Sequence, residues 1–208
     1  MGRPMSSLWP IAAVSLLVLA GCSAGKDAVA QGSSYAFVAP GGKTQIFYNP
    51  PATRGKAPDL GGDDLAHPGH QIRLSDYAGQ VVVVNIWGSW CGPCRVEAPE
   101  LEIVYQQTQA SGVEFLGIDV RDTRSAAEDF VTAHGVTYPS IFDPPGRSLL
   151  ALQGYPRSVV PSTIVLDREH RVAAVFLQRI IAAQLLPVVQ RLAAETSSAA
   201  PTTSRAAS

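Results

Sequence analysis

The pattern of apolar and polar positions predicts strands that alternate with helices. Two apolar runs, at residues 81–87 and 113–120, have the length of buried strands. Residues at helical spacing follow each run: Leu101, Val104, Tyr105 and Thr108 after the first, and Ala126, Phe130, Val131 and His134 after the second. Gly135 then supplies a helix stop signal. The alternation indicates an α/β fold with a partly parallel sheet.

Shorter elements complete the predicted domain. We expect short strands at 35–38 and 45–48 across Pro40-Gly41-Gly42, a loop over 49–69, a half-buried strand at 71–74, a strand at 139–143, a short helix over 147–153, a hairpin of 162–167 and 172–176, and a last helix over 182–194. Two prolines interrupt the helical patterns. Pro99 should kink the first helix, and Pro187 either lies inside the last helix or marks the start of a shorter one.

The two ends of the chain differ in kind from its middle. Arg3 is followed by an almost wholly apolar run from Leu8 to Ala20, which has the length of a signal peptide and is short for a membrane-spanning helix. Small polar residues over 23–34 and a Ser, Thr and Ala tail over 196–208 lack the apolar surface that ordering requires. We therefore expect a signal peptide over 1–21, a flexible tether over 22–34, one domain over 35–195 and a disordered tail over 196–208.

The chemistry of the chain is concentrated in the run Trp90-Cys91-Gly92-Pro93-Cys94, between a predicted strand and a predicted helix. Disulfide exchange begins with a thiolate, which the amino end of a helix favours. We therefore expect Cys91 to attack and Cys94, about one turn further on, to resolve the mixed disulfide. Pro93 suits an early helical position, and Trp90 is expected to cover the thiol.

Two other roles for these cysteines stay open. The pair could be a permanent disulfide or two buried thiols with a structural role. Alternatively His67 and His70, spaced H-x-x-H, could join the cysteines in a zinc site with four ligands, although Pro68-Gly69 between them indicates a loop tip. The formal net charge of −1 gives no indication of a nucleic-acid partner.

The stretch Leu19-Ala20-Gly21-Cys22 resembles the lipobox of bacterial lipoproteins, where the signal is cleaved before the cysteine and the sulfur carries diacylglycerol. The resemblance implies lipidation of Cys22 and a chain anchored to the cell membrane on its extracytoplasmic face, where disulfides persist. It also leaves Cys91 and Cys94 as a single redox pair. The alternative is an ordinary secretory signal, or an uncleaved anchor, with an incidental cysteine.

From about residue 59 to residue 195 the chain resembles the thioredoxin fold, and more narrowly the membrane-tethered TlpA/ResA-type thiol–disulfide oxidoreductases. The stretches that carry the match are Ala57-Pro58-Asp59-Leu60, Leu74-Ser75-Asp76-Tyr77-Ala78-Gly79, residues 84–94, Glu97-Ala98-Pro99 and Val160-Pro161-Ser162-Thr163. The resemblance implies a thioredoxin-like α/β fold: a central mixed sheet flanked by helices, with an N-terminal strand extension and a central helical insertion.

The resemblance also assigns residue roles. Pro161 matches the family's cis-proline beside the sulfurs, and the Val160 backbone would pair with a substrate peptide, with Trp90 also at the substrate site. A trans proline at a strand start is the alternative. Glu97 matches an acidic residue that moves protons for the thiols, unless it is a solvated surface charge. Asn85 stands where cytoplasmic thioredoxins carry a buried Asp, and it cannot titrate.

The implied activity is the reduction of protein disulfides, with apocytochrome c as the substrate during cytochrome c biogenesis. A membrane electron donor of the CcdA/DsbD type would recharge the protein, and no cofactor is expected. Gly92-Pro93, the dipeptide of reducing thioredoxins, favours a reductant. The alternatives are an oxidase that introduces disulfides into exported proteins and a non-catalytic module with a structural disulfide or zinc site. Peroxide reduction is a further rival, which the C-x-x-C and cis-proline pattern disfavours.

Overall fold

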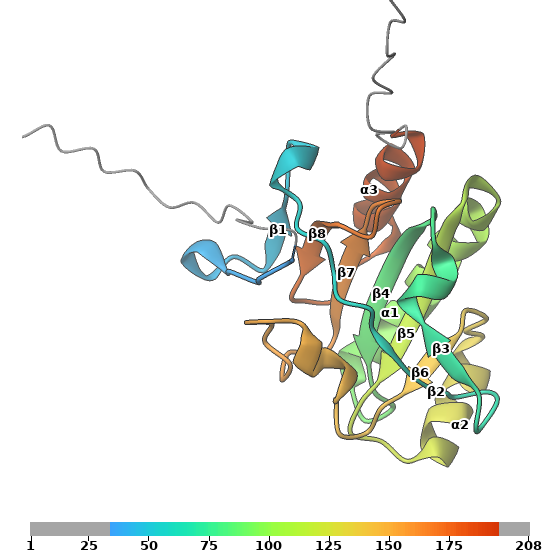
Figure 1. Cartoon of the computed structure of the whole chain (residues 1–208). Coiled ribbons are helices and arrows are strands. Elements are labelled where there is room, and N and C mark those ends of the chain that lie inside the picture. The colour runs from blue at the N-terminus through green and yellow to red at the C-terminus, as the bar shows by residue number, and fades with distance from the viewer. Residues whose placement is uncertain (1–33, 196–208) are drawn as a thin grey trace, which may run out of the picture.

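The computed structural model describes residues 34–195, in which eight strands form one mixed sheet (Figure 1). The strands are β1 (Gln45–Phe47), β2 (Gly61–Asp64), β3 (Gln71–Arg73), β4 (Val81–Trp87), β5 (Val113–Asp119), β6 (Ser140–Phe142), β7 (Ser162–Leu166) and β8 (Val172–Phe176). The α-helices are α1 (Gly92–Thr108), α2 (Arg124–His134) and α3 (Ala182–Ala194). The predicted signal peptide, the tether up to residue 33 with Cys22, and the predicted tail over 196–208 lie outside the described residues.

The strand order is β1-β8-β7-β4-β5-β6-β2-β3, with β4 near the centre. β4, β5 and β6 run parallel, while β7 and β8 run antiparallel to their neighbours, as the predicted hairpin requires. The ends of β4, β5, β6 and β8 and the start of β7 therefore lie at one end of the sheet. We call it the cysteine end, because Cys91 follows β4 directly. The start of β8 and the end of β7 form the opposite end.

The three helices share one face of the sheet. Side chains such as Leu101 of α1, Phe130 of α2 and Leu185 of α3 pack in one buried cluster with Val83 and Phe115 of the central strands. The other face is covered by the N-terminal segment and by the insertion between β6 and β7, which contribute Tyr35, Phe37, Leu149 and Tyr155 to a second cluster. The expected mixed sheet with helices, N-terminal extension and central insertion is thus confirmed (Figure 1).

The predicted pairing of residues 35–38 with 45–48 is wrong. The Tyr35 N–H donates to the Lys56 carbonyl and the Phe37 N–H to the Gln153 carbonyl, both at 2.8 Å. β1 pairs with β8 instead. Burial of the two aromatic rings on the helix-free face decides the path of this segment, and such a long-range preference has no local sequence signal.

β2 lies within residues 49–69, which the composition predicts to be loop. Its sequence, Gly-Gly-Asp-Asp, has no apolar residue and therefore gives no strand signal. The strand forms because β3 and β6 both pair with it. A glycine is needed at position 62, since a Cβ there would lie 2.5 Å from a methyl carbon of Ile141.

Both prolines lie inside their helices. α1 continues through Pro99, and α3 runs from Ala182 to Ala194 through Pro187, so the alternative of a shorter last helix is wrong. The predicted helix over 147–153 is a short 3₁₀ helix, η5 (Ser148–Ala151). Within residues 34–195, no helix combines the length and the apolar character needed to cross a membrane.

Candidate active site

Cys91 and Cys94 form a disulfide at the start of α1. Cys91 is the N-cap residue of this helix, and its Sγ accepts a hydrogen bond from the Cys94 backbone N–H at 3.2 Å. Pro93 occupies the first turn, as predicted. The unpaired N–H groups of the helix start favour an anion at this position, so the geometry supports Cys91 as the sulfur that ionises.

The loop before Cys91 is held by side chains from two neighbouring elements. The Ser89 backbone N–H and hydroxyl donate to the two carboxylate oxygens of Asp122, at 2.6 and 2.8 Å. Arg95 of α1 donates to the Ser89 carbonyl at 2.9 Å. Gly88 is required here because a Cβ would lie 2.4 Å from the Trp90 Nε1. The backbone leading to the reactive sulfur is therefore fixed by the loop that follows β5.

Trp90 stands beside the disulfide with 45% of its surface exposed. Its Nε1 donates to the Val120 carbonyl at 3.0 Å, and the guanidinium of Arg121 lies 4.2 Å from the centre of its ring. Arg121 has a positive φ of 55°, which is uncommon for a residue other than glycine. The ring is thus fixed in place while half of it stays open to a partner.

The peptide bond between Val160 and Pro161 is cis, as the family resemblance predicts. Pro161 is buried, and Val160 packs against the cluster that contains both cysteines. The next residue, Ser162, pairs with Ile86 of β4, which places this segment alongside the strand that leads to Cys91. The substrate-binding roles of Trp90, Val160 and Pro161 stay a prediction.

Glu97 is buried on α1, one turn after Cys94, so the alternative of a solvated surface charge is wrong. Its Oε1 accepts from the Asn85 side-chain amide at 3.0 Å and from the Thr163 hydroxyl at 3.4 Å, while its Oε2 has no partner among the described residues. Burial raises the pKa of Glu97 to about 8, although nearby groups, including the Ile180 backbone and Thr163, favour the carboxylate. Glu97 can therefore hold or release a proton near neutral pH.

A second buried acid was not predicted. Asp119, the last residue of β5, is fully buried, and neither of its carboxylate oxygens has a hydrogen-bond partner within residues 34–195. Burial, together with the charge of Asp122, raises the pKa of Asp119 to about 8. Its place at the carboxyl end of a parallel strand, beside the strand that precedes the cysteines, was the available sequence signal.

His67 and His70 do not join the cysteines. The His67 ring hydrogen-bonds to Asp64 at 2.8 Å and lies 6.1 Å from the His70 ring. Residues 34–195 contain no group of three or more His, Cys, Asp or Glu side chains arranged to hold a metal ion. The four-ligand zinc site considered as an alternative is therefore not formed.

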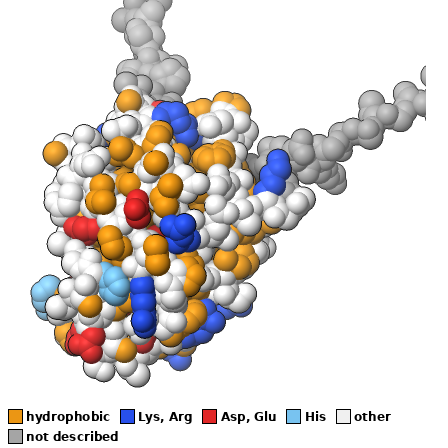
Figure 2. Space-filling model, turned by 180° about the vertical axis from the view of Figure 1, so that it is seen from behind, with side chains coloured by type: hydrophobic (Ala, Val, Ile, Leu, Met, Phe, Trp, Pro, Cys, Tyr) orange, Lys and Arg blue, Asp and Glu red, His pale blue; other side chains and the backbone are white. Residues whose placement is uncertain are grey.

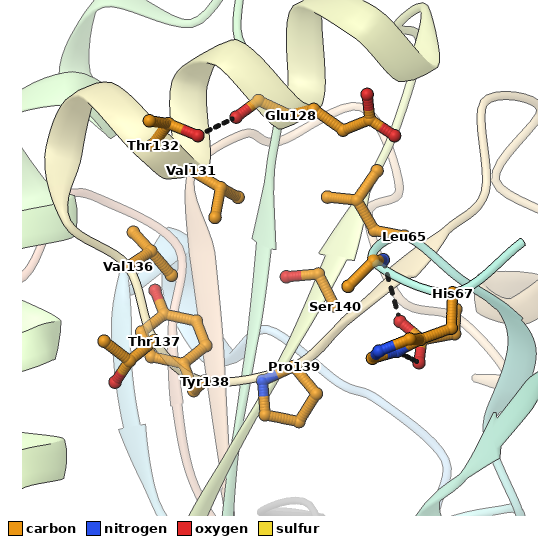
Figure 3. Close-up of a pocket in the computed structure, with 12 residues that line it drawn as sticks. Leu65, His67, Glu128, Val131, Thr132, Val136, Thr137, Tyr138, Pro139 and Ser140 are labelled. Atoms are coloured by element: carbon orange, nitrogen blue, oxygen red, sulfur yellow. Dashed lines mark hydrogen bonds and ion pairs between the residues drawn. The ribbon is translucent and has the colours of Figure 1, made fainter.

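A pocket of about 370 Å³ lies between α2, the start of β6 and the turn after β2 (Figure 3). Val131, Val136 and Tyr138 give it an apolar wall, and Glu128 and His67 lie at its sides. None of the predicted site residues lines it. The candidate active site is instead the surface at the half-exposed Trp90, beneath which Cys91 and Cys94 are each only 3% exposed.

Comparisons with known proteins agree with this site. The model of the AhpC/TSA family matches residues 53–175. A thiol–disulfide oxidoreductase ResA of Geobacillus kaustophilus is 36% identical over 116 residues, which are 56% of this chain and 64% of that protein. The match therefore spans less than two thirds of that relative.

Two solved structures extend the likeness over more of the chain. A structure described as a secreted thiol-disulfide isomerase from Corynebacterium glutamicum is 48% identical with a TM-score of 0.76, covering 79% of this chain and all of the other. A DsbF homologue from Corynebacterium diphtheriae is 43% identical with a TM-score of 0.72, covering 76% of this chain and 99% of the other.

Proposed function

This chain belongs to the AhpC/TSA family, and from that membership we propose that it is a ResA-like thiol–disulfide oxidoreductase acting on protein disulfides. One observation carries the proposal: a Cys91–Cys94 disulfide at the start of α1, flanked by the cis Val160–Pro161 bond and the buried Glu97. A purely structural disulfide needs neither an ionisable buried acid nor a half-exposed tryptophan beside it.

The reaction begins from the reduced pair. The Cys91 thiolate attacks one sulfur of the substrate disulfide, forms a Cys91–substrate bond and releases the other substrate sulfur as a thiolate. The Cys94 thiolate then attacks Cys91 Sγ, forms the Cys91–Cys94 bond and releases the second substrate thiolate. The two protons lost by the cysteines go to the two thiolates released, so one disulfide is exchanged for another.

Glu97 is proposed to carry protons in this exchange. The raised pKa of about 8 keeps both forms of Glu97 accessible near neutral pH. The carboxylate form accepts the proton that Cys94 loses as it becomes a nucleophile, and the neutral form can pass that proton to a released thiolate. Asn85 holds the carboxyl oxygen Oε1 by donating to it, which fixes the orientation of the acid. Asn85, at the position of the buried Asp of cytoplasmic thioredoxins, thus orients the acid, and Glu97 on α1 supplies the titratable group.

The finer proposal concerns place and partners. We infer a protein lipidated on Cys22, held on the extracytoplasmic face of the cell membrane, and reducing apocytochrome c during cytochrome c biogenesis. The lipobox-like Leu19-Ala20-Gly21-Cys22 and the ResA relatives support this inference. A membrane donor of the CcdA/DsbD type would return electrons to the pair.

A trapping experiment tests both the oxidoreductase activity and the proposed role in cytochrome c biogenesis. Cys94→Ala leaves Cys91 able to attack but removes the resolving sulfur, so mixed disulfides with substrates should accumulate in cells and disappear on reduction. Cys91→Ala is the matched control and should trap nothing. Adducts that contain apocytochrome c support the biogenesis role, while adducts that contain only other exported proteins overturn it. Absence of adducts, together with no exchange by the purified wild-type protein, overturns the oxidoreductase proposal itself.

The direction of electron flow has a second candidate. The two structural neighbours are described as a disulfide isomerase and a DsbF homologue, which favours disulfide formation or isomerisation. The equilibrium reduction potential of the Cys91–Cys94 pair in the purified protein decides whether the protein reduces disulfides or forms and isomerises them. A reductase requires a potential clearly below the poise of its compartment, where about 30 mV changes the free energy by about 1.4 kcal/mol.

A further inference from the structure

The exposed cations of this protein are unevenly distributed between the two ends of the sheet. The set that we call the cationic rim comprises Lys43, Arg95, Arg121, Arg147, Arg157 and Arg179, all of them exposed. None of the six has a carboxylate within ion-pair distance among residues 34–195. Within the same residues, Lys56 is the one other exposed cation without such a partner, and it lies away from the rim. Among the other arginines of residues 34–195, five pair with carboxylates and the partly buried Arg168 donates to backbone carbonyls; the five are Arg54, Arg73, Arg124, Arg171 and Arg191.

The topology places the whole rim at the cysteine end. Three of the cations follow strand ends: Arg121 follows β5, Arg147 follows β6 and Arg179 follows β8. Arg157 precedes the start of β7, and Arg95 lies in the first turn of α1. Lys43 precedes Gln45, which pairs with the last residue of β8. The Arg121 N–H donates to the Pro144 carbonyl at 2.9 Å, which joins the loops after β5 and β6. In Figure 2, several blue side chains lie along the lower right edge of the molecule.

The acids at the same end are turned inward. Both oxygens of Asp122 accept from Ser89, and both oxygens of Asp143 accept from the backbone of Arg147 and Ser148. Asp119 and Glu97 are buried. The carboxylates that follow the strands are therefore used to hold loops or are shielded from solvent, while the guanidinium groups face outward.

The centre of the rim is apolar and open. Trp90 is 45% exposed and Val96, two residues after Cys94, is 59% exposed. Apolar residues at the centre of a surface with charged residues around them match the anatomy of a protein interface. Arg121 adds geometric evidence, since it has a positive φ and its guanidinium lies 4.2 Å from the centre of the Trp90 ring, with no carboxylate partner among residues 34–195.

We propose that the cationic rim docks an acidic protein segment that carries the exchanging disulfide, so that carboxylates on both sides of the substrate cysteine meet these cations. The proposal rests on the proposed function and adds the chemical class of its substrate. Complementary charge raises the rate of encounter and orients the partner before the covalent step, with an effect that salt removes.

The test uses the reduced full chain and three peptides that share one intramolecular disulfide, flanked on both sides by Glu, by Ser or by Lys. We expect the second-order rate constant for peptide reduction to fall in that order. At low salt the Glu peptide should react about tenfold faster than the Lys peptide, and the ratio should approach one at about 0.5 M salt. Equal rates for the three peptides overturn the proposal. Absence of reaction with the Ser peptide instead contradicts the proposed function.

Charge-reversal variants locate the effect. Arg147→Glu and Arg157→Glu should each lower the rate constant for the Glu peptide about threefold or more and leave the Ser peptide within about twofold. Lys56→Glu makes the same charge change at the opposite end of the sheet and should leave the peptide preference unaltered. An equal loss in Lys56→Glu shows that net charge alone acts, and overturns the proposal.

Anionic lipid is the competing source of negative charge. Vesicles of phosphatidylglycerol and of phosphatidylcholine are compared for binding of the wild type and of Arg121→Glu. If Arg121→Glu loses binding to phosphatidylglycerol while the peptides show no charge preference, the rim belongs to the membrane surface and the proposal is overturned. Equal vesicle binding by both proteins, with the peptide preference present, supports the acidic protein partner.

Discussion

The two ends of the sheet use charge in opposite ways. At the opposite end, Arg54 is buried and bonds to Asp167 at 3.1 Å and to Glu195 at 2.6 Å, so that cations and carboxylates satisfy one another. At the cysteine end, Oε2 of Glu97 and both carboxylate oxygens of Asp119 are buried without a hydrogen-bond partner among residues 34–195. The exposed arginines at that end have no carboxylate partner within the same residues. Ion pairs at the opposite end stabilise the fold, whereas at the cysteine end the buried acids can exchange protons and the exposed arginines can contact a partner.

The largest expected effect comes from breaking the paired end. Arg54→Met removes the cation from a buried site and leaves Asp167 without that partner, which should cost about 3–5 kcal/mol of the free energy of unfolding. Urea unfolding at pH 7 measures this loss. The exchange rate of the molecules that stay folded should remain within about twofold of the wild type, and a large drop in that rate would show that the two ends are coupled.

The next effect concerns the pH dependence of stability at the cysteine end. The pKa of Glu97 rises from 4.5 to about 8 on folding, so the unfolded chain loses this proton at lower pH than the folded chain. The free energy of unfolding that Glu97 contributes through this shift is therefore fully present below about pH 4.5. It declines as the pH rises to about 8, by at most about 1.4 kcal/mol per pH unit. Glu97→Gln should flatten this alkaline decline in unfolding experiments between pH 5 and 8.

The pKa of Asp119 shifts in the same direction, from 3.8 to about 8, so Asp119→Asn separates the contributions of the two acids. Both substitutions should flatten part of the decline, but only Glu97→Gln should change the pH profile of disulfide exchange. The exposed Glu128→Gln on α2 is the matched control and should change neither curve. An unchanged exchange profile in Glu97→Gln would remove Glu97 from the proposed proton transfer.

A smaller effect is expected on the acid side, from the opposite end. The hydrogen bond from Arg54 lowers the pKa of Glu195, so the stability that this carboxylate adds is present above its ordinary value of 4.5 and is lost as pH falls through its lowered value. Glu195→Gln should cost about 1 kcal/mol at pH 7, because the side chain is partly exposed. It should also reduce the loss of stability on acidification, which thermal unfolding from pH 7 down to pH 3 measures.

The smallest effect is expected for an exposed pair. Arg73 and Asp59 lie 3.3 Å apart, but their side chains are 57% and 44% exposed. Arg73→Met should change the free energy of unfolding by at most about 0.5 kcal/mol, because solvent screens such pairs. It serves as the matched control for Arg54→Met, and a comparable loss in both variants would mean that burial does not distinguish the two ion pairs.

The sequence predicts the centre of the molecule better than its periphery. The apolar run over 81–87 and the C-x-x-C that follows it fix a strand, a helix start and the reactive pair, because these signals are local. β2 escapes prediction because Gly-Gly-Asp-Asp has no apolar pattern, and its strand form depends on β3 and β6. Burial of Glu97 was expected only from the family resemblance.

Long-range pairing explains the remaining gaps. The partners of Arg54 lie 113 and 141 residues away, so no local pattern identifies them. The same holds for Asp122, which holds the loop before Cys91 across 33 residues. The unpaired state of the cationic rim is also invisible in the sequence, since it depends on which carboxylates the fold turns inward.

The contact between Arg54 and Glu195 bears on how far the disulfide can lie from the membrane. It joins the N-terminal part of the domain to the end of α3, and Ser34 lies beside Lys56 at the same end of the sheet, opposite the cysteines. If Cys22 carries the lipid as we propose, the twelve residues from there to Ser34 span at most about 40 Å. The disulfide then lies at the end of the domain opposite the point where the tether joins it, and its greatest distance from the membrane is the length of the tether plus that of the domain.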